Sequence, residues 1–208
     1  MTPRVLAGIG VAVVAVVIGA AFAVDGDRGV NNDGVTATVP ADDAAGAAPP
    51  TVAVPDLSDR GQHQELVDID GWLQSDVTSL EELEGKVVAV QFWTFGCRNC
   101  KATLPHMRDL YEKYQDQGFE IVGVHSPEFD NEAVQANIID AAADLGVTWP
   151  IALDTAKRTF HSWQEGPTAH WPRIYLLDRD GHIRYDHIGE GRYDQIDAAV
   201  EALLAEPA

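Results

Sequence analysis

Short apolar runs alternate with longer amphipathic stretches over the second half of the chain. The runs at residues 85–93 and 119–125 are rich in β-branched and aromatic side chains, which is typical of strands buried on both faces of an α/β sheet. Between them, residues 99–117 carry apolar side chains at spacings of three and four. This spacing predicts an amphipathic helix that ends at Gly118.

The same alternation continues to the end of the chain. Helices are expected over residues 131–145, 157–163 and 192–205, strands over 149–153, 173–178 and 183–188, and a helical turn over 80–84. Asp180-Gly181 between the last two strands indicates a hairpin. The order βαβαβαββα predicts an α/β fold, with a mixed central sheet flanked by helices, in one domain over residues 60–208.

The first 59 residues have a different composition. Residues 5–24 carry no charge and follow Arg4, and twenty such residues are about enough to span a bilayer as a helix. Residues 1–24 are therefore predicted to be a single-pass membrane anchor with the domain on the extracytoplasmic side. The Ala21-Phe22-Ala23 pattern also suits a signal peptidase, and cleavage after Ala23 would make the protein secreted. Residues 25–59, rich in Ala, Asp, Gly and Pro, predict a flexible linker.

The charge balance narrows the class of partner. The chain has 14 basic and 33 acidic residues, a formal net charge of −19. Such a surface repels phosphate backbones, so a nucleic-acid partner is not expected.

The chemistry of the chain is concentrated in its only two cysteines, Cys97 and Cys100. They fall between a buried strand and the start of a long helix, where free backbone N–H groups and the helix dipole stabilise a thiolate. Arg98 adds positive charge nearby. We expect Cys97 to be the exposed nucleophile and Cys100, one turn further, to resolve the mixed disulfide.

Two other interpretations of this pair are weaker. A zinc site needs two further ligands, and the sequence has no second cysteine pair to supply them. A structural disulfide across so short a loop would constrain the unfolded chain very little. The strand–CxxC–helix context favours redox chemistry.

The stretch Val90-Gln-Phe-Trp-Thr-Phe-Gly-Cys-Arg-Asn-Cys-Lys-Ala-Thr-Leu-Pro105 resembles the active-site strand and helix of the thioredoxin superfamily. It is most similar to the redoxin or TlpA-like branch, especially the thioredoxin domain of DipZ-type membrane proteins. Gly-Trp-Leu at 71–73, Gly-Val-His-Ser-Pro-Glu-Phe at 123–129 and Trp-Pro-Arg at 171–173 support the resemblance. It covers about residues 71–204 and implies a thioredoxin-like fold. None of the functions considered for this chain needs an organic cofactor.

The resemblance also implies roles for residues outside the cysteine pair. Pro172 would be a cis-proline that faces the cysteines and exposes the preceding backbone to a client strand. Trp171 would flank the pair and influence its redox potential. Trp93 would either shelter the site or pack in the core.

Three positions depart from the family pattern. Gln91 stands where thioredoxins carry a buried acid, Thr103 where many TlpA-like reductases carry a glutamate, and Gly96 where a tryptophan is usual. The proton acceptor for Cys100 is therefore open. The candidates, each of which could also be an ordinary loop residue, are Glu128, His125 and His170.

The function expected from this sequence is extracytoplasmic thiol–disulfide exchange with protein clients, recharged by a membrane or soluble redox partner. Resemblance favours reduction as the direction, whereas a thiolate stabilised by Arg98 would favour oxidation. One alternative is a thiol peroxidase, because Thr94-Phe-Gly-Cys97 matches a T-x-x-C pattern, although Val90 replaces the expected proline. A second is a copper carrier that uses both thiolates and a histidine.

Overall fold

The computed structural model of the protein describes residues 52–164, 167 and 169–207. The predicted anchor at residues 1–24 and most of the predicted linker lie outside these residues. Among the helices of the described part, none combines the length and apolarity that a membrane span requires.

The described residues fold around a six-stranded sheet in the order β1-β4-β3-β2-β5-β6. The strands are β1 (Trp72–Leu73), β2 (Val87–Trp93), β3 (Phe119–His125), β4 (Ile151–Leu153), β5 (Arg173–Leu177) and β6 (Ile183–Ile188). β2, β3 and β4 are parallel, whereas β5 is antiparallel to β2 and β6 to β5. The predicted mixed sheet is confirmed, with the unpredicted two-residue strand β1 added antiparallel to β4.

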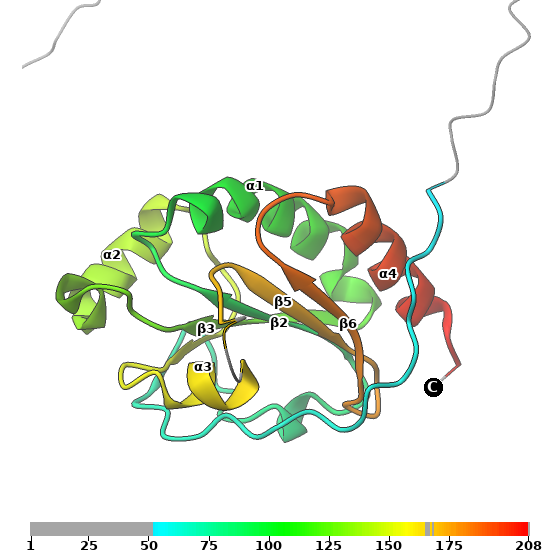
Figure 1. The fold of residues 1–208 in the computed structure, drawn as a ribbon, viewed down its shortest axis with the longest axis horizontal. Coiled ribbons are helices and arrows are strands. Elements are labelled where there is room, and N and C mark those ends of the chain that lie inside the picture. Colours follow the sequence, from blue (N-terminus) through cyan, green and yellow to red (C-terminus); the bar gives the residue numbers. More distant parts are fainter. Residues whose placement is uncertain (1–51, 165–166, 168, 208) are drawn as a thin grey trace, which may run out of the picture. The chain divides into compact units, whose positions relative to one another are not determined.

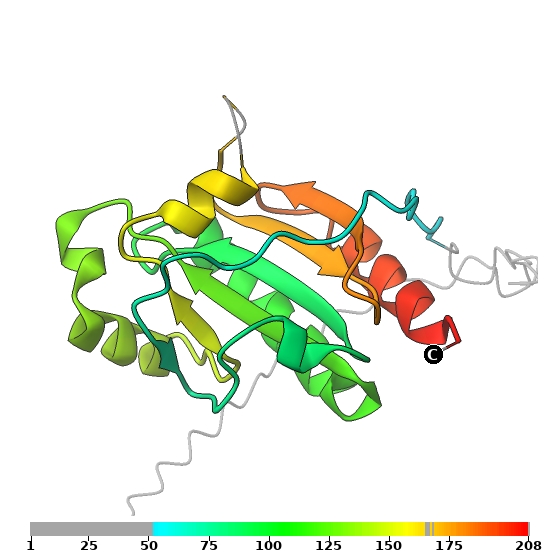
Figure 2. The same cartoon turned by 90° about the horizontal axis from the view of Figure 1, so that it is seen from below.

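Helices cover both faces of this sheet. They are α1 (Arg98–Tyr114), α2 (Gln135–Asp144), α3 (Arg158–Trp163) and α4 (Tyr193–Ala205), with the 3-10 turns η1 (Glu81–Leu83), η2 (Gln115–Gln117) and η3 (Asp130–Ala133). α1, α2 and α4 lie on one face, and α3 lies on the other (Figure 1). Seen from below, α3 and the chain that precedes β2 cross the second face (Figure 2).

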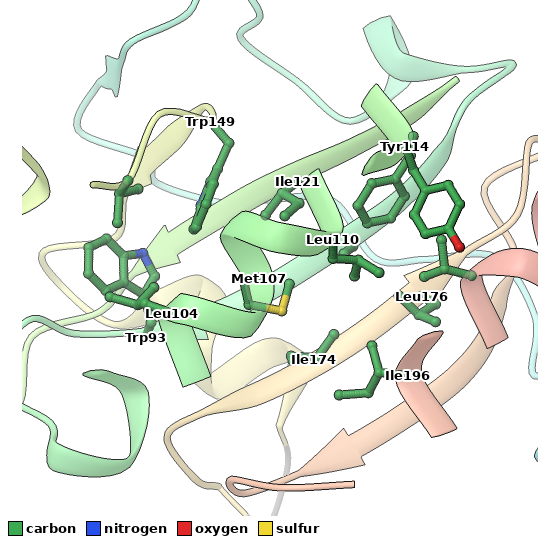
Figure 3. Close-up of a cluster of buried hydrophobic side chains, with 14 of the residues drawn as sticks. Trp93, Leu104, Met107, Leu110, Tyr114, Ile121, Trp149, Ile174, Leu176 and Ile196 are labelled. Atoms are coloured by element: carbon green, nitrogen blue, oxygen red, sulfur yellow. The ribbon is translucent and has the colours of Figure 1, made fainter. Parts of the chain in front are cut away.

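The core explains why β2 is central and continuous. Ala89 and Trp93 of this strand pack toward α1, while Val90 and Phe92 pack into the cluster on the opposite face. Figure 3 shows the α1 side of the core, where Leu104, Met107 and Leu110 meet Ile121, Ile174 and Ile196 from neighbouring elements. Because both faces of β2 are buried, the end of the strand that leads to the cysteines is held firmly.

Helix α2 begins later than the periodicity predicts. The residues from 131 onward were expected to be helical, but η3 ends at Ala133 and Val134 is extended, with φ −84° and ψ 113°. The side chain of Glu132 accepts hydrogen bonds from the backbone N–H groups of Glu128 and Phe129, which stabilises a separate turn before the helix. A side-chain contact of this kind leaves no trace in hydrophobic periodicity.

The folded unit also starts before the predicted boundary at residue 60. Nε of Arg184 donates to the carbonyl of Leu57 at 2.8 Å, and Oδ2 of Asp59 lies 2.9 Å from Nδ1 of His182. Leu57 is partly buried against the core. The last residues of the predicted linker therefore belong to the domain and pack beside β6.

Candidate active site

Cys97 occupies the N-cap position of α1. Its backbone is extended, with φ −66° and ψ 121°, and its sulfur accepts a hydrogen bond from the backbone N–H of Cys100 at 3.2 Å. An N-cap side chain normally satisfies one of the free N–H groups of the first helical turn, and here a sulfur takes the place of the usual oxygen. The sulfur is partly exposed, so the cap is also an accessible nucleophile.

These contacts lower the pKa of Cys97 to about 7. The largest cause is the hydrogen bond from the Cys100 thiol, and the backbone N–H groups of Cys100 and Asn99 add to it. Partial burial and the negative charge of Glu128 act in the opposite direction. A substantial fraction of Cys97 is therefore thiolate at neutral pH, and the thiolate is the nucleophilic form.

Cys100 has the opposite environment. Its side chain is fully buried in the core, and burial, followed by its hydrogen bond to Cys97, raises its pKa far above the ordinary range. Cys100 therefore remains a thiol and serves as a hydrogen-bond donor until Cys97 has reacted.

Trp171 and Pro172 lie at the same end of the sheet as the cysteines. Arg173, the first residue of β5, pairs with Phe92, so the two residues before it lie near the end of β2. The Trp171–Pro172 peptide bond is cis, the isomer that the family resemblance implies. Trp171 is half-buried and stacks on Phe160, with ring centroids 4.1 Å apart.

Arg98 and Trp93 contribute less directly than the sequence suggests. Arg98 is the exposed first residue of α1, but it is not among the largest influences on the pKa of Cys97, which are hydrogen bonds, burial and the charge of Glu128. Trp93 is fully buried in the same cluster as Cys100. It packs in the core beneath the cysteines and is not exposed to solvent at the site.

His125, at the end of β3, lies beneath the loop that carries Cys97. Its Nε2 atom is 3.4 Å from the backbone nitrogen of Phe95 and 3.4 Å from the hydroxyl oxygen of Thr94. Burial lowers the pKa of His125 to about 4, against the opposing effect of the nearby Glu132. The ring is neutral at pH 7 and can accept hydrogen bonds from this loop.

Glu132 is a residue of the site that the sequence did not reveal. Its side chain is only 1% exposed, and Oε2 accepts from the backbone N–H groups of Glu128 at 2.6 Å and Phe129 at 3.2 Å. Its other oxygen lies against Gly96, where an added methyl group would overlap it. The carboxylate therefore fills the space beside Gly96, and the glycine at this position is the one sequence signal that could have indicated such a neighbour.

The proposed proton acceptors lie in different surroundings. Glu128 is exposed and close enough for its charge to act on Cys97, whereas His125 is buried and His170 is exposed. Gln91 is fully buried, and neither polar atom of its amide has a hydrogen-bond partner among the described residues. The hydroxyl of Thr103 donates to the carbonyl of Asn99 at 3.0 Å.

Comparison with known proteins agrees with this geometry. Residues 53–186 match the model of the AhpC/TSA family. Protein DipZ of Mycobacterium bovis is 37% identical over 151 residues, a match that covers 71% of this chain but only 21% of DipZ. The thiol-disulfide oxidoreductase YkuV of Bacillus subtilis is 28% identical, and the match covers 68% of this chain and 93% of that protein. The chain thus spans about a fifth of the length of DipZ.

A solved structure shows the same fold. The thiol-disulfide isomerase of Corynebacterium glutamicum superimposes with a TM-score of 0.57 at 22% identity, over 74% of this chain and 98% of that one. The resemblance to thioredoxin-like and DipZ-type proteins is confirmed. The chain belongs to the AhpC/TSA family, has a thioredoxin-like fold, and counts thiol-disulfide oxidoreductases among its relatives.

Proposed function

We propose that the protein is an extracytoplasmic thiol–disulfide oxidoreductase that reduces disulfides in protein clients. The observation that carries this proposal is the difference in exposure and pKa between the two cysteines. Cys97 is accessible and has a pKa of about 7, whereas Cys100 is buried and has a raised pKa. This asymmetry separates an attacking thiolate from a resolving thiol.

The exchange proceeds in two steps. The Cys97 thiolate attacks one sulfur of the client disulfide, a mixed disulfide forms, and the other client sulfur leaves as a thiolate. Cys100 then gives up its proton to that thiolate and attacks Cys97, which releases the second client sulfur as a thiolate and closes the Cys97–Cys100 disulfide. Two electrons pass from the pair to the client, and a dithiol partner must return them.

The moderate pKa of Cys97 supports reduction as the direction. A thiolate that is strongly stabilised favours the reduced form of the pair and makes it an oxidant, as in DsbA, with a pKa of about 3.5 and a potential of about −120 mV. Thioredoxin, a reductant, combines a pKa of about 7 with a potential of about −270 mV. Cys97, with a pKa of about 7, is close to the second case.

Equilibration with glutathione buffers followed by an insulin-reduction assay tests both parts of the proposal. We expect a reduction potential below about −220 mV, and insulin reduction that is lost in Cys97→Ser. A potential near about −120 mV would reverse the direction but keep the exchange chemistry. Absence of exchange with any disulfide would overturn the function itself.

The two alternatives have less support. The hydroxyl of Thr94 lies 3.4 Å from Nε2 of His125 and makes no hydrogen bond with the sulfur of Cys97, so the arrangement expected of a peroxidatic T-x-x-C pattern is not formed. In the described part of the chain, no three His, Cys, Asp or Glu side chains gather as a metal site would require. A copper carrier would therefore have to complete its ligand set from elsewhere.

The extracytoplasmic location is proposed from the sequence. Residues 5–24 are uncharged and follow Arg4, which supports a single-pass anchor with the domain outside the cell. The mass of the mature protein tests the two forms of this proposal, because cleavage after Ala23 would remove the segment. Retention of residues 1–24 in the membrane fraction is the expected result.

A further inference from the structure

The sheet order places two different segments on either side of the redox loop. β3 and β5 are the neighbours of β2, and β5 runs antiparallel to it. The chain leaving β3 and the chain entering β5 therefore lie at the same end of the sheet as residues 94–97. One flank is Trp171–Pro172, and the other is the segment of residues 128–134.

Glu132 fixes the second flank to the redox loop. Its carboxylate accepts two backbone hydrogen bonds from within the segment, at Glu128 and Phe129, and its free oxygen lies against Gly96. Since Gly96 directly precedes Cys97, the Glu132 carboxylate brings the segment close to the residue before the nucleophile. The flank is thus a fixed part of the surface around the sulfur.

This fixed flank presents an aromatic side chain to solvent. Phe129 is 59% exposed, the most exposed of the large hydrophobic side chains in the described residues, and Val134 on the same segment is 48% exposed. Contact of this aromatic ring with water is unfavourable, so burial of the ring against a partner would contribute favourable free energy to binding. Position and exposure together indicate a contact surface.

Acidic residues flank Phe129 in the sequence. Glu128 precedes Phe129 and Asp130 follows it, and both side chains are exposed. The charge of Glu128 reaches Cys97, because it is one of the influences that raise the pKa of this thiol. The exposed segment at this end of the sheet therefore combines an apolar ring with two acidic side chains, one of which acts electrostatically on Cys97.

We propose that Phe129, with Glu128 and Asp130 beside it, is a docking surface for extended client segments that carry an apolar side chain and a Lys or Arg near their reactive cysteine. The inference rests on the proposed exchange function and adds a class of client to it. The apolar side chain would pack on Phe129, and the basic group would lie close to the two carboxylates.

Stopped-flow reduction of synthetic substrates tests this surface. One disulfide-linked peptide carries Phe and Lys beside its cysteine, a second carries Ser and Glu at the same positions, and a small aromatic disulfide reports the intrinsic reactivity of Cys97. For wild type we expect faster reduction of the Phe–Lys peptide. Phe129→Ser should slow that peptide about fivefold and leave the small disulfide within about twofold, as for loss of a contact residue at an interface.

Two further variants complete the design. Asp130→Asn should reduce the preference for the basic peptide, and this effect should shrink at high salt. Val54→Ser is the matched control, because Val54 is 54% exposed but lies beside Asp194 and Ala198 of α4. Equal effects of Phe129→Ser and Val54→Ser on the Phe–Lys peptide, or no peptide preference in wild type, would overturn the docking surface. Failure of wild type to reduce even the small disulfide would instead overturn the exchange function.

Discussion

Cys97 does at the start of α1 what a serine or aspartate does at the start of most helices. Its sulfur accepts the N–H of Cys100, so the same contact that caps the helix also stabilises the thiolate. Helix stability and nucleophile activation are therefore coupled at a single residue. The coupling makes the environment of Cys97 testable by changing its neighbour.

Replacing Cys100 by Ala should raise the pKa of Cys97 from about 7 toward its ordinary value of 9.0, because the thiol hydrogen bond is the largest cause of the lowering. The backbone N–H groups of Cys100 and Asn99 remain, so the shift should stop short of 9.0. The pH dependence of iodoacetamide alkylation measures this, since the rate rises with the thiolate fraction as pH increases. An unchanged midpoint near 7 in Cys100→Ala would contradict the assignment.

Gly96→Ala should destabilise the fold, because the new methyl group would overlap the carboxylate of Glu132. Overpacking of this kind costs about 1–3 kcal/mol of the free energy of unfolding. In Gly96→Ala/Glu132→Ala the overlap is absent. The loss in free energy of unfolding of the double variant should therefore be smaller than the sum of the losses of the two single variants. Urea denaturation measures all three, and strict additivity would show that the two side chains do not meet.

At the scale of elements, the short helix α3 depends on a residue that precedes it. Its N-cap, Lys157, has a positive φ of 57° and provides no side-chain cap. Asp154, fully buried, accepts from the N–H groups of Thr159 at 3.2 Å and Phe160 at 2.8 Å, and from the hydroxyl of Ser126 at 2.8 Å. α3 in turn holds Phe160 against Trp171 beside the site.

Asp154→Ala should therefore cost about 2–3 kcal/mol of the free energy of unfolding, because it leaves buried donors without an acceptor. Asp154→Asn, which keeps one carbonyl oxygen, should cost less. Chemical denaturation gives both values, and tryptophan fluorescence reports any displacement around Trp171. A loss below about 0.5 kcal/mol in Asp154→Ala would show that α3 is capped in another way.

Elements with strong periodicity were predicted correctly from the sequence. β2 and β3 are buried on both faces as their continuous apolar runs indicate, and α1 begins beside the cysteines as its spacing predicts. β1 was missed because two residues on a sheet edge carry no periodic signal. The start of α2 was misplaced because the side chain of Glu132 bonds backward within the chain.

At the scale of the whole molecule, the site depends on strand order, which a sequence pattern does not specify. The cysteines were predicted because strand–CxxC–helix is a local pattern. Glu132 fell within the helix expected over residues 131–145, and only the fold brings it to Gly96. Phe129 likewise lies at the same end of the sheet as Cys97 because β3 is the neighbour of β2 in the sheet. Long-range proximity of this kind requires the tertiary structure.

The central claim is that Cys97 attacks client disulfides and Cys100 resolves them. Trapping tests it most directly. The Cys100→Ser variant of the full-length chain is expressed, and acid is added to protonate the thiols and stop further exchange. Disulfide-linked adducts are then identified by mass spectrometry. The account predicts mixed disulfides between Cys97 and client cysteines in this variant and none in Cys97→Ser/Cys100→Ser. Adducts that form equally well through Cys100 in Cys97→Ser, or no adducts in Cys100→Ser, would contradict it.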